Sequence, residues 1–231
     1  MKTIGLLGGM SWESTIPYYR LINEAVKQRL GGLHSAKLLL HSVDFAEIEA
    51  CQRAGDWEAA GAQLAQAARG LQAAGADLLL IGANTMHKVA PEIEAAIDIP
   101  LLHVADATAQ AIRAAGITCV GLLGTRYTME QAFYVDRLAS HGLEVLVPPP
   151  ADREEVHRVI FDELCLGRFE EASRDQFRRV MADLVARGAG GIVLGCTEIG
   201  LLVDAGDATV PQFDTTGLHA MAAVEAALAE G

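Results

Sequence analysis

The sequence predicts an α/β protein made of two similar halves, each a four-stranded parallel sheet flanked by helices. Short apolar runs alternate with amphipathic segments along the whole chain of 231 residues. This alternation is typical of parallel strands joined by crossover helices. Similar short motifs also recur at a nearly constant spacing. A chain of this length can bury a full core in one large or two small α/β domains.

The individual elements follow from apolar run lengths and helical periodicity. Strands are expected at 3–8, 36–42, 77–82, 100–104, 118–123, 143–147, 190–195 and 209–213. Helices are expected at 15–30, 56–74, 105–115, 129–139, 170–187 and 215–229. The Ala-rich composition of 56–74 supports its helix. The prolines at 148–150 mark a loop that leads into a further helix near Arg153.

Three landmarks recur in the same order, which predicts an internal duplication. Gly5-Leu-Leu-Gly matches Gly121-Leu-Leu-Gly at an offset of 121 − 5 = 116 residues. Gly82-Ala-Asn-Thr matches Gly195-Cys-Thr-Glu at an offset of 195 − 82 = 113 residues. Pro100-Leu-Leu-His matches Pro211-Gln-Phe-Asp at an offset of 211 − 100 = 111 residues. We expect the N-terminal half to cover residues 1–98 plus 209–231 and the C-terminal half to cover residues 99–208.

Composition excludes several classes of function. The formal net charge is −12 and no basic stripe is present, which argues against nucleic-acid binding and against attachment to an anionic membrane. No apolar stretch approaches the roughly 20 residues of a membrane span. The first apolar run is interrupted by glycines and Glu13, so it fits a strand better than a signal peptide. The four cysteines are scattered without a C-x-x-C pair, and we expect them to be reduced in a cytoplasmic protein.

Open parallel sheets bind ligands at the carboxyl ends of their strands, so the chemistry is expected there. Four expected strand ends combine glycine with hydroxyl, amide or thiol side chains, at 8–15, 82–87, 124–129 and 195–198. The helices that follow would offer backbone N–H groups to an anion. A cleft between the halves would therefore suit a small carboxylate. Neither a dinucleotide-binding signature nor a Walker A loop is present, and no zinc pattern occurs, so no cofactor or metal is expected.

Cys196 is the strongest candidate for a reactive residue. It ends an expected strand beside an expected helix N-terminus, a position that favours the thiolate and lowers the pKa of the thiol. Its counterpart in the first half is Ala83, whose methyl group carries no proton. The alternative is that Cys196 is a buried structural cysteine.

The neighbours of these two positions are candidate binding groups. Asn84, Thr85 and Thr197 could donate hydrogen bonds to a substrate carboxylate, or could cap helices, and the two roles can coexist. Glu198 could polarise a neighbour or favour a helix dipole. Further binding candidates are the hydroxyls of Thr125 and Thr128, Met10 as a wall of the pocket, and Gln52 on a lid at 44–52. His87 could orient the site or cap a helix, whereas His41 and His103 are expected in the core. The aromatic side chains of Trp12, Tyr18 and Tyr19 are expected in the core or in the pocket wall.

The sequence resembles the aspartate/glutamate racemase superfamily, in particular its broad-specificity amino-acid racemases. The resemblance rests on Gly5-Leu-Leu-Gly-Gly-Met-Ser-Trp-Glu-Ser-Thr, His41-Ser-Val-Asp-Phe-Ala-Glu-Ile, Asn84-Thr-Met-His, Leu123-Gly-Thr-Arg-Tyr-Thr-Met and Leu194-Gly-Cys-Thr-Glu-Ile. It implies two Rossmann-like (flavodoxin-like) halves with the active site between them, a homodimer, and racemisation of an amino acid without pyridoxal phosphate or metal.

The same resemblance implies two proton carriers that flank the substrate α-carbon, at Cys196 and at the position of Ala83. These carriers are usually cysteines, and the first can be a threonine in this branch. Dedicated aspartate racemases also carry a lysine upstream of the second cysteine, where this chain has Glu163-Leu-Cys-Leu-Gly. A dicarboxylic or broad range of amino acids is therefore expected rather than strict preference for aspartate.

Because two-base racemisation needs a carrier on each face, Ala83 leaves several interpretations open. The chain could be an impaired racemase, natural or engineered at residue 83. It could resemble arylmalonate decarboxylases, in which a lone cysteine protonates a planar intermediate. It could also be a catalytically idle amino-acid binding protein.

Overall fold

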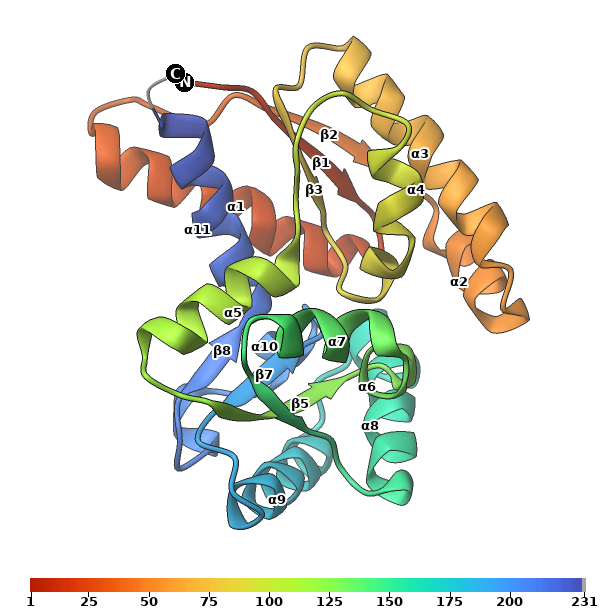
Figure 1. Ribbon diagram of the computed structural model, residues 1–231, viewed down its shortest axis with the longest axis vertical. Coiled ribbons are helices and arrows are strands. Elements are labelled where there is room, and N and C mark those ends of the chain that lie inside the picture. Colours follow the sequence, from red (N-terminus) through yellow and green to blue (C-terminus); the bar gives the residue numbers. More distant parts are fainter. Residues whose placement is uncertain (230–231) are drawn as a thin grey trace. The chain divides into compact units, whose positions relative to one another are not determined.

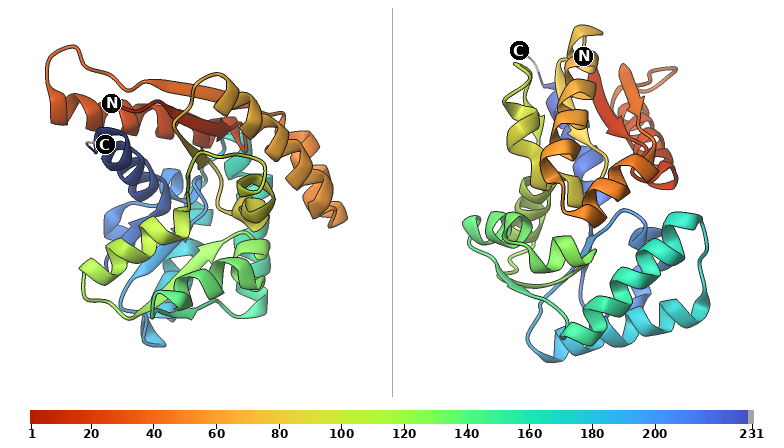
Figure 2. Two further views of the ribbon diagram at one scale, coloured as in Figure 1. Left: turned by 45° about the horizontal axis from the view of Figure 1, so that its top comes forward. Right: turned by 90° about the vertical axis from the view of Figure 1, so that its right-hand side faces the viewer.

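The structure is a computed structural model that describes residues 1–229, and it contains two compact units (Figures 1 and 2). Unit 1 consists of Met1–Val104 together with the chain from His219 onward, and unit 2 consists of Ala105–Leu218. The chain therefore passes from unit 1 to unit 2 at the start of one helix and returns within the last one. None of the helices within residues 1–229 is both long and apolar enough to cross a membrane.

Unit 1 contains a four-stranded sheet in the order β2-β1-β3-β4 with every pairing parallel. Its strands are β1 (Ile4–Gly8), β2 (Leu38–Ser42), β3 (Leu78–Ile81) and β4 (Leu101–Leu102). Its helices are α1 (Trp12–Leu30), α2 (Phe45–Ala54), α3 (Trp57–Ala73), α4 (Ala90–Glu94), the 3₁₀ turn η1 (Thr85–Val89) and most of α11 (Thr215–Leu228).

Helices cover both faces of this sheet, as the period-two alternation of buried strands requires. On one face Ile4, Leu6 and Leu80 pack under α1 and α11. On the other face Leu7 and Leu79 pack under α3, η1 and α4. Alanines dominate the inner sides of α3 and α11, which lets these helices lie close to the sheet.

Unit 2 repeats the arrangement with a parallel sheet in the order β6-β5-β7-β8. Its strands are β5 (Cys119–Gly124), β6 (Glu144–Leu146), β7 (Ile192–Gly195) and β8 (Gln212–Asp214). Its helices are α5 (Val104–Ala114), α6 (Arg126–Glu130), α7 (Ala132–Ser140), α8 (Pro150–Asp162), α9 (Glu171–Ala186) and α10 (Ile199–Leu202), with 3₁₀ turns η2 (Leu164–Leu166) and η3 (Ala205–Asp207).

The two sheets share one strand order, which confirms the predicted α/β fold with two similar four-stranded halves. The division between the units differs from the expected one at both boundaries. β4 pairs with β3 in unit 1, whereas residues from 99 onward were expected in the second half. β8 pairs with β7 in unit 2, whereas residues from 209 onward were expected in the first. Each of these strands completes its own repeat before the chain crosses.

Several local expectations are wrong for identifiable reasons. The helix expected at 129–139 is split into α6 and α7, because Gln131 adopts an extended conformation between them. α8 begins at Pro150, since proline fits the first turn of a helix. His41 is exposed on β2 rather than in the core. Of the four candidate aromatic and thioether walls, Met10 and Tyr18 are buried whereas Trp12 and Tyr19 are exposed.

Candidate functional site

The strand order places two strand ends side by side in each unit. In unit 1 the chain runs from β1 to its neighbour β2 and then to its other neighbour β3, so the loops after β1 and β3 lead in opposite directions. In unit 2 the loops after β5 and β7 diverge in the same way. The backbones are close at both points. The N–H of Gly82 donates to the carbonyl of Leu7 at 2.7 Å, and a Cβ at Gly195 would lie 2.8 Å from the carbonyl oxygen of Leu123.

The loop after β1 is held by the first turn of α1. Gly9 has a φ of 87°, and its N–H donates to Thr15 Oγ1 at 2.8 Å. The hydroxyls of Ser14 and Thr15 donate to the carbonyl of Ser11 at 2.9 and 3.0 Å. Met10 is buried and belongs to the core cluster beside α3. These contacts fix the backbone of the loop, while Met10 packs as a core side chain.

Ala83, Asn84 and Thr85 follow β3 and are all buried. Asn84 precedes η1 in a helical conformation, and its side chain makes no capping hydrogen bond. Helix capping therefore does not account for Asn84. The side chain of Ala83 is a methyl group and offers no proton to a ligand.

A buried histidine holds the backbone of Ala83. His87 Nδ1 lies 2.8 Å from the carbonyl oxygen of Ala83, and the N–H of Val104 donates to His87 Nε2 at 3.2 Å. Because a carbonyl only accepts, the proton of this imidazole is on Nδ1, and the ring is neutral. His87 therefore holds the backbone of Ala83 and of Val104 in place.

A second buried histidine lies beside the first and was not identified from the sequence. His219 Nε2 donates to the carbonyl of Leu102 at 2.7 Å, and its Nδ1 accepts from the Tyr18 hydroxyl at 2.9 Å. The rings of His87 and His219 have centroids 5.7 Å apart. Burial lowers the pKa of His219 to about 3. The ring is therefore neutral, and a polar cluster without charge lies behind the end of β3.

Gln52 lies on α2, and Asp44 caps that helix by accepting from the N–H of Ala46 at 3.0 Å. Its side chain is buried, and Nε2 donates to Met86 Sδ at 2.9 Å. Its Oε1 is buried and has no hydrogen-bond partner among residues 1–229. A buried amide oxygen without a partner is uncommon in a folded protein. Gln52 therefore retains an unused acceptor in unit 1.

In unit 2 the end of β5 is a helix cap. Thr125 is the N-cap of α6, and its Oγ1 accepts from the N–H of Thr128 at 3.3 Å. The two threonine hydroxyls lie 3.2 Å apart, and both side chains are buried. Capping is an established role of Thr125 here, so a binding role would be additional.

The end of β7 carries a buried carboxylate between two thiols. Cys196 Sγ donates to Glu198 Oε2 at 3.0 Å, and Thr197 Oγ1 donates to the same oxygen at 2.7 Å. Cys165 Sγ, on η2, donates to Glu198 Oε1 at 3.8 Å. Glu198 is only 2% exposed. The sequence indicated that Glu198 could polarise a neighbour, whereas the contact with Cys165 was not anticipated.

The expected lowering of the pKa of Cys196 is wrong. Burial raises the pKa of this thiol well above its ordinary value, and the negative charge of Glu198 raises it further. The helix that was expected to favour the thiolate, α10, begins only at Ile199 and spans four residues. Cys196 is therefore a protonated thiol that faces a proton acceptor.

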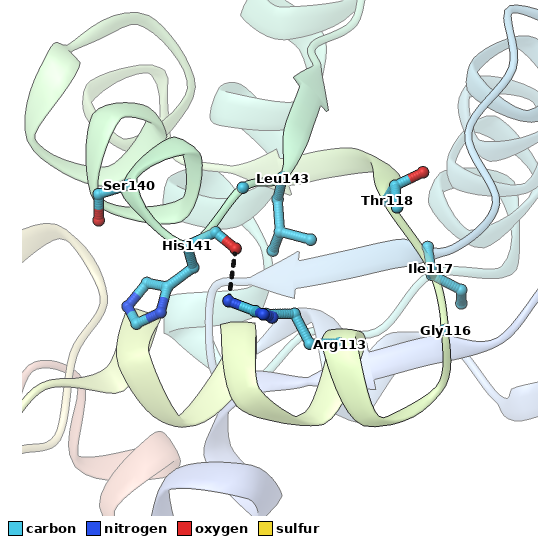
Figure 3. A pocket seen from close by; sticks show the side chains of 8 residues that line it. Arg113, Gly116, Ile117, Thr118, Ser140, His141 and Leu143 are labelled. Carbon is cyan, nitrogen blue, oxygen red and sulfur yellow. Dashed lines mark hydrogen bonds between the residues drawn. The ribbon is translucent and has the colours of Figure 1, made fainter.

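A hollow of about 470 Å³ lies at the opposite, amino edge of the unit 2 sheet (Figure 3). Arg113 donates from Nη1 to the carbonyl of His141 at 3.1 Å, at the end of α7. A cation at a helix C-terminus is a stabilising arrangement, so this arginine has a structural role. Within residues 1–229 no group of three or more His, Cys, Asp or Glu side chains is placed to hold a metal ion.

The sequence and the fold of this chain are similar to those of known proteins. The model of the Asp/Glu/Hydantoin racemase family matches residues 7–223. The chain belongs to this family. The match spans both units and includes every candidate residue from Met10 to Glu198.

Individual members of this family are similar over nearly their full length. The crystal structure of a provisionally assigned Asp/Glu racemase from Yersinia pestis is 60% identical, covers 99% of this chain and 100% of its own, and has a TM-score of 0.92. An aspartate racemase homologue from Pyrococcus horikoshii is 35% identical, with coverages of 98% and 99% and a TM-score of 0.84. The broad-specificity amino-acid racemase of Bacillus subtilis is 23% identical over 98% of both chains.

Proposed function

We propose that this racemase-family protein is an enzyme that exchanges the α-proton of an amino acid without a cofactor, with Cys196 as its proton carrier. The observation that carries the proposal is the buried Cys196 thiol, which donates to Glu198 Oε2 at 3.0 Å. Ala83 occupies the opposite carrier position, so complete racemisation is impaired. This description applies whether Ala83 is natural or engineered.

Glu198 makes both directions of proton transfer possible. For abstraction, the thiol proton moves from Cys196 Sγ to Glu198 Oε2, and the resulting thiolate takes the substrate α-proton. For return, the thiol first exchanges the abstracted proton with water; Cys196 then gives a solvent-derived proton to the carbanion and recovers its own proton from Glu198. The raised pKa of Cys196 makes the thiolate a strong base once formed. Each cycle leaves the protein in its starting protonation state.

The buried polar side chains beside the two strand ends would bind the substrate. We assign Asn84, Thr85 and Thr197 to the α-carboxylate, on which charge develops as the proton leaves. The unused Oε1 of Gln52 would accept from the substrate ammonium group. Thr125, Thr128 and Met10 are proposed as further substrate-binding residues.

Ala83 changes the stereochemical outcome that is expected. A proton leaves and returns through Cys196 on one face of the α-carbon, so exchange with solvent proceeds without inversion. Inversion requires a second carrier, and here water or the hydroxyl of Thr85 would have to supply the proton on that face. The substrate range is proposed to be broad or dicarboxylic.

Incubation with individual amino acids in deuterated water tests this proposal. We expect α-deuterium to accumulate by NMR while chiral chromatography shows little inversion. Cys196→Ser should lower exchange by roughly 10²–10⁴-fold. Ala83→Thr or Ala83→Cys should restore inversion without weakening exchange. Binding of amino acids with no exchange for any of them would contradict the enzyme and indicate a binding protein.

A second candidate reaction is favoured by the raised pKa of Cys196. A single protonated thiol facing a site with no opposing carrier can protonate a carbanion formed when a malonate loses carbon dioxide. Release of carbon dioxide from aryl or alkyl malonates, abolished by Cys196→Ser, would support this reaction over α-proton exchange. The two assays use different substrates and therefore separate the candidates.

We also propose that the protein is a cytoplasmic homodimer. None of the four cysteines forms a disulfide within residues 1–229, as a reducing compartment would keep them. Sedimentation at micromolar concentration tests the dimer, and fractionation of the source cells tests the location.

A further inference from the structure

The edge strand β2 is exposed although its sequence is that of a buried strand. Leu40 is 47% exposed, and His41 and Ser42 are also exposed. β2 pairs with β1 on one side only, because it stands at the end of the sheet (Figure 1). Proteins protect free edges with charges, prolines or bulges. Residues 38–42 contain none of these residues, and their pairing with β1 is regular.

An apolar patch on α1 adjoins this edge. Trp12, Ile16 and Tyr19 are 61%, 56% and 58% exposed and follow the helical spacing of one face. With Leu40 they line a groove of about 300 Å³. We call Trp12, Ile16, Tyr19 and Leu40 the edge patch. A free strand edge flanked by exposed aromatic and aliphatic side chains is typical of a surface that is covered by a partner.

The backbone of β2 fixes which residues face outward. The carbonyl of Lys37 accepts from the N–H of Ile4, and the N–H of Val43 donates to the carbonyl of Gly8. Odd-numbered residues of β2 therefore pair with β1. Since N–H and C=O of one residue point to the same side, Leu38, Leu40 and Ser42 present their backbone groups at the free edge.

We propose that β2 pairs antiparallel with β2 of a second copy of this chain, across a two-fold axis at Leu40. In this register Leu40 lies opposite Leu40 of the partner subunit, and Leu38 lies opposite the partner's Ser42. All three outward residues then form hydrogen-bonded pairs, which is the tight pairing of an antiparallel ladder. The four strands of each unit 1 sheet become one continuous sheet, and the two edge patches meet on one face.

Charge complementarity identifies the partner as a second copy. Lys37 is exposed just before β2, and Asp44 is exposed just after it. Antiparallel pairing brings Lys37 beside the partner subunit's Asp44 at both ends of the contact. A two-fold axis also makes the interface self-complementary. Because each copy has a formal net charge of −12, association needs such local attraction. This inference rests on the proposed homodimer and adds the surface that forms it.

The first test introduces a charge at the axis. Leu40→Arg places two like charges opposite each other, so we expect the dimer of the full chain to weaken by roughly 100-fold or more in sedimentation equilibrium. Leu33→Arg is the matched control, because Leu33 is fully exposed at 103% outside the patch and should leave the dimer intact. Circular dichroism should show both variants folded.

The second test separates charge from packing. Lys37→Glu should weaken the dimer, because this register places residue 37 opposite the partner subunit's Val43, next to the partner's Asp44, whose charge the new carboxylate would repel. Adding Asp44→Asn should recover part of the loss, since asparagine keeps the helix cap while removing the charge. In the unmodified dimer the amides of Leu38, Leu40 and Ser42 should be protected from hydrogen exchange, and Leu40→Arg should expose them.

Two results would overturn the inference: one would exclude only this interface, and the other would exclude the homodimer as well. A dimer that survives Leu40→Arg unweakened, with rapid exchange of the Leu40 amide, would place the interface elsewhere and leave the homodimer in place. A wild-type chain that is monomeric at micromolar concentration would remove both the interface and the homodimer. Neither result bears on Cys196, so the proposed chemistry is tested independently.

Discussion

At the scale of single residues, the central feature is that Glu198 accepts hydrogen bonds from three side chains while almost fully buried. Two come from thiols and one from Thr197. A buried carboxylate is expensive unless such donors compensate it. The donors of Glu198 include the proposed proton carrier itself, so its charge is held where it can take the proton of Cys196.

Replacing Glu198 by glutamine separates its charge from its shape. Glu198→Gln retains the size and a hydrogen-bonding group but cannot take a proton from Cys196. We expect the pKa of Cys196 to fall, because the negative charge that raises it is gone, while α-proton exchange falls by roughly 10²–10⁴-fold. Thiolate absorbance against pH and deuterium exchange measure the two effects. Glu130→Gln, at an exposed position of unit 2, should change neither; equal exchange rates in Glu198→Gln and wild type would contradict the role.

His219 makes the stability of the fold depend on acid. Its pKa is about 3 in the folded protein, whereas in the unfolded chain it titrates near its ordinary value of 6.5. The unfolded state therefore binds one more proton between these values, and stability is lost as pH falls from 6.5 towards 3. The slope is about 1.4 kcal/mol per pH unit for this one proton. Tyr18 and His87 are the polar neighbours of the ring.

Urea unfolding at pH 7 and pH 5 measures this dependence. His219→Gln should be less stable at pH 7, since it loses the Tyr18 contact, but its stability should fall less steeply with acid. His34→Gln is the control, because it replaces an exposed histidine by the same residue. An identical slope in His219→Gln and wild type would contradict the assignment.

At the scale of elements, glycines at the strand ends set how closely the loops approach. A Cβ at Gly195 would lie 2.8 Å from the carbonyl oxygen of Leu123, closer than real contacts allow. Gly195→Ala should therefore destabilise the protein by roughly 1–3 kcal/mol, because backbone must move. Gly70 lies inside α3, and a Cβ there meets nothing within 4 Å. Gly70→Ala should stabilise by about 0.5–1 kcal/mol. Urea midpoints measure both, and equal effects would contradict the distinction.

Elements also mark the limit of what sequence reasoning can provide. Apolar runs located all eight strands found within residues 1–229, because buried parallel strands have a short and distinctive pattern. They did not show that β2 would be exposed, since exposure depends on the strand order and not on the run itself. The sequence suggested that Glu198 could act on a neighbour, because Glu198 is only two residues from Cys196. Cys165 was not, because its contact depends on where η2 folds.

The same limit applies to the position expected to lower the pKa of Cys196. A strand end before a helix suggests a helix dipole, and the sequence cannot show that the helix is one turn long and begins three residues later. Burial and a neighbouring carboxylate then dominate. His219 was missed for a related reason, because its partners Tyr18 and Leu102 are more than a hundred residues away in the sequence.

At the scale of the whole molecule, unit 1 is built from both ends of the chain. The N–H of Lys2 donates to the carbonyl of Ala227 at 2.9 Å, so the two ends of the chain meet in this unit. Four α11 side chains complete the core over β1 and β3: Ala220, Ala223, Val224 and Ala227. Without α11 that face of the sheet would be uncovered, whereas unit 2 is continuous in sequence.

This arrangement predicts how fragments of the chain will behave. Residues 1–104 alone should be unstable and aggregate, because Leu78 and Leu80 lose the helix that covers them. Joining residues 219–231 through a short Gly/Ser linker to the start of 1–104 should restore cooperative unfolding, since the two ends already meet. Circular dichroism and urea unfolding distinguish the fragments. A matched control replaces Ala220, Ala223, Val224 and Ala227 by serine in the joined fragment, which should return it to the behaviour of 1–104. If 1–104 unfolds cooperatively without α11, the helix is not needed for the core of unit 1.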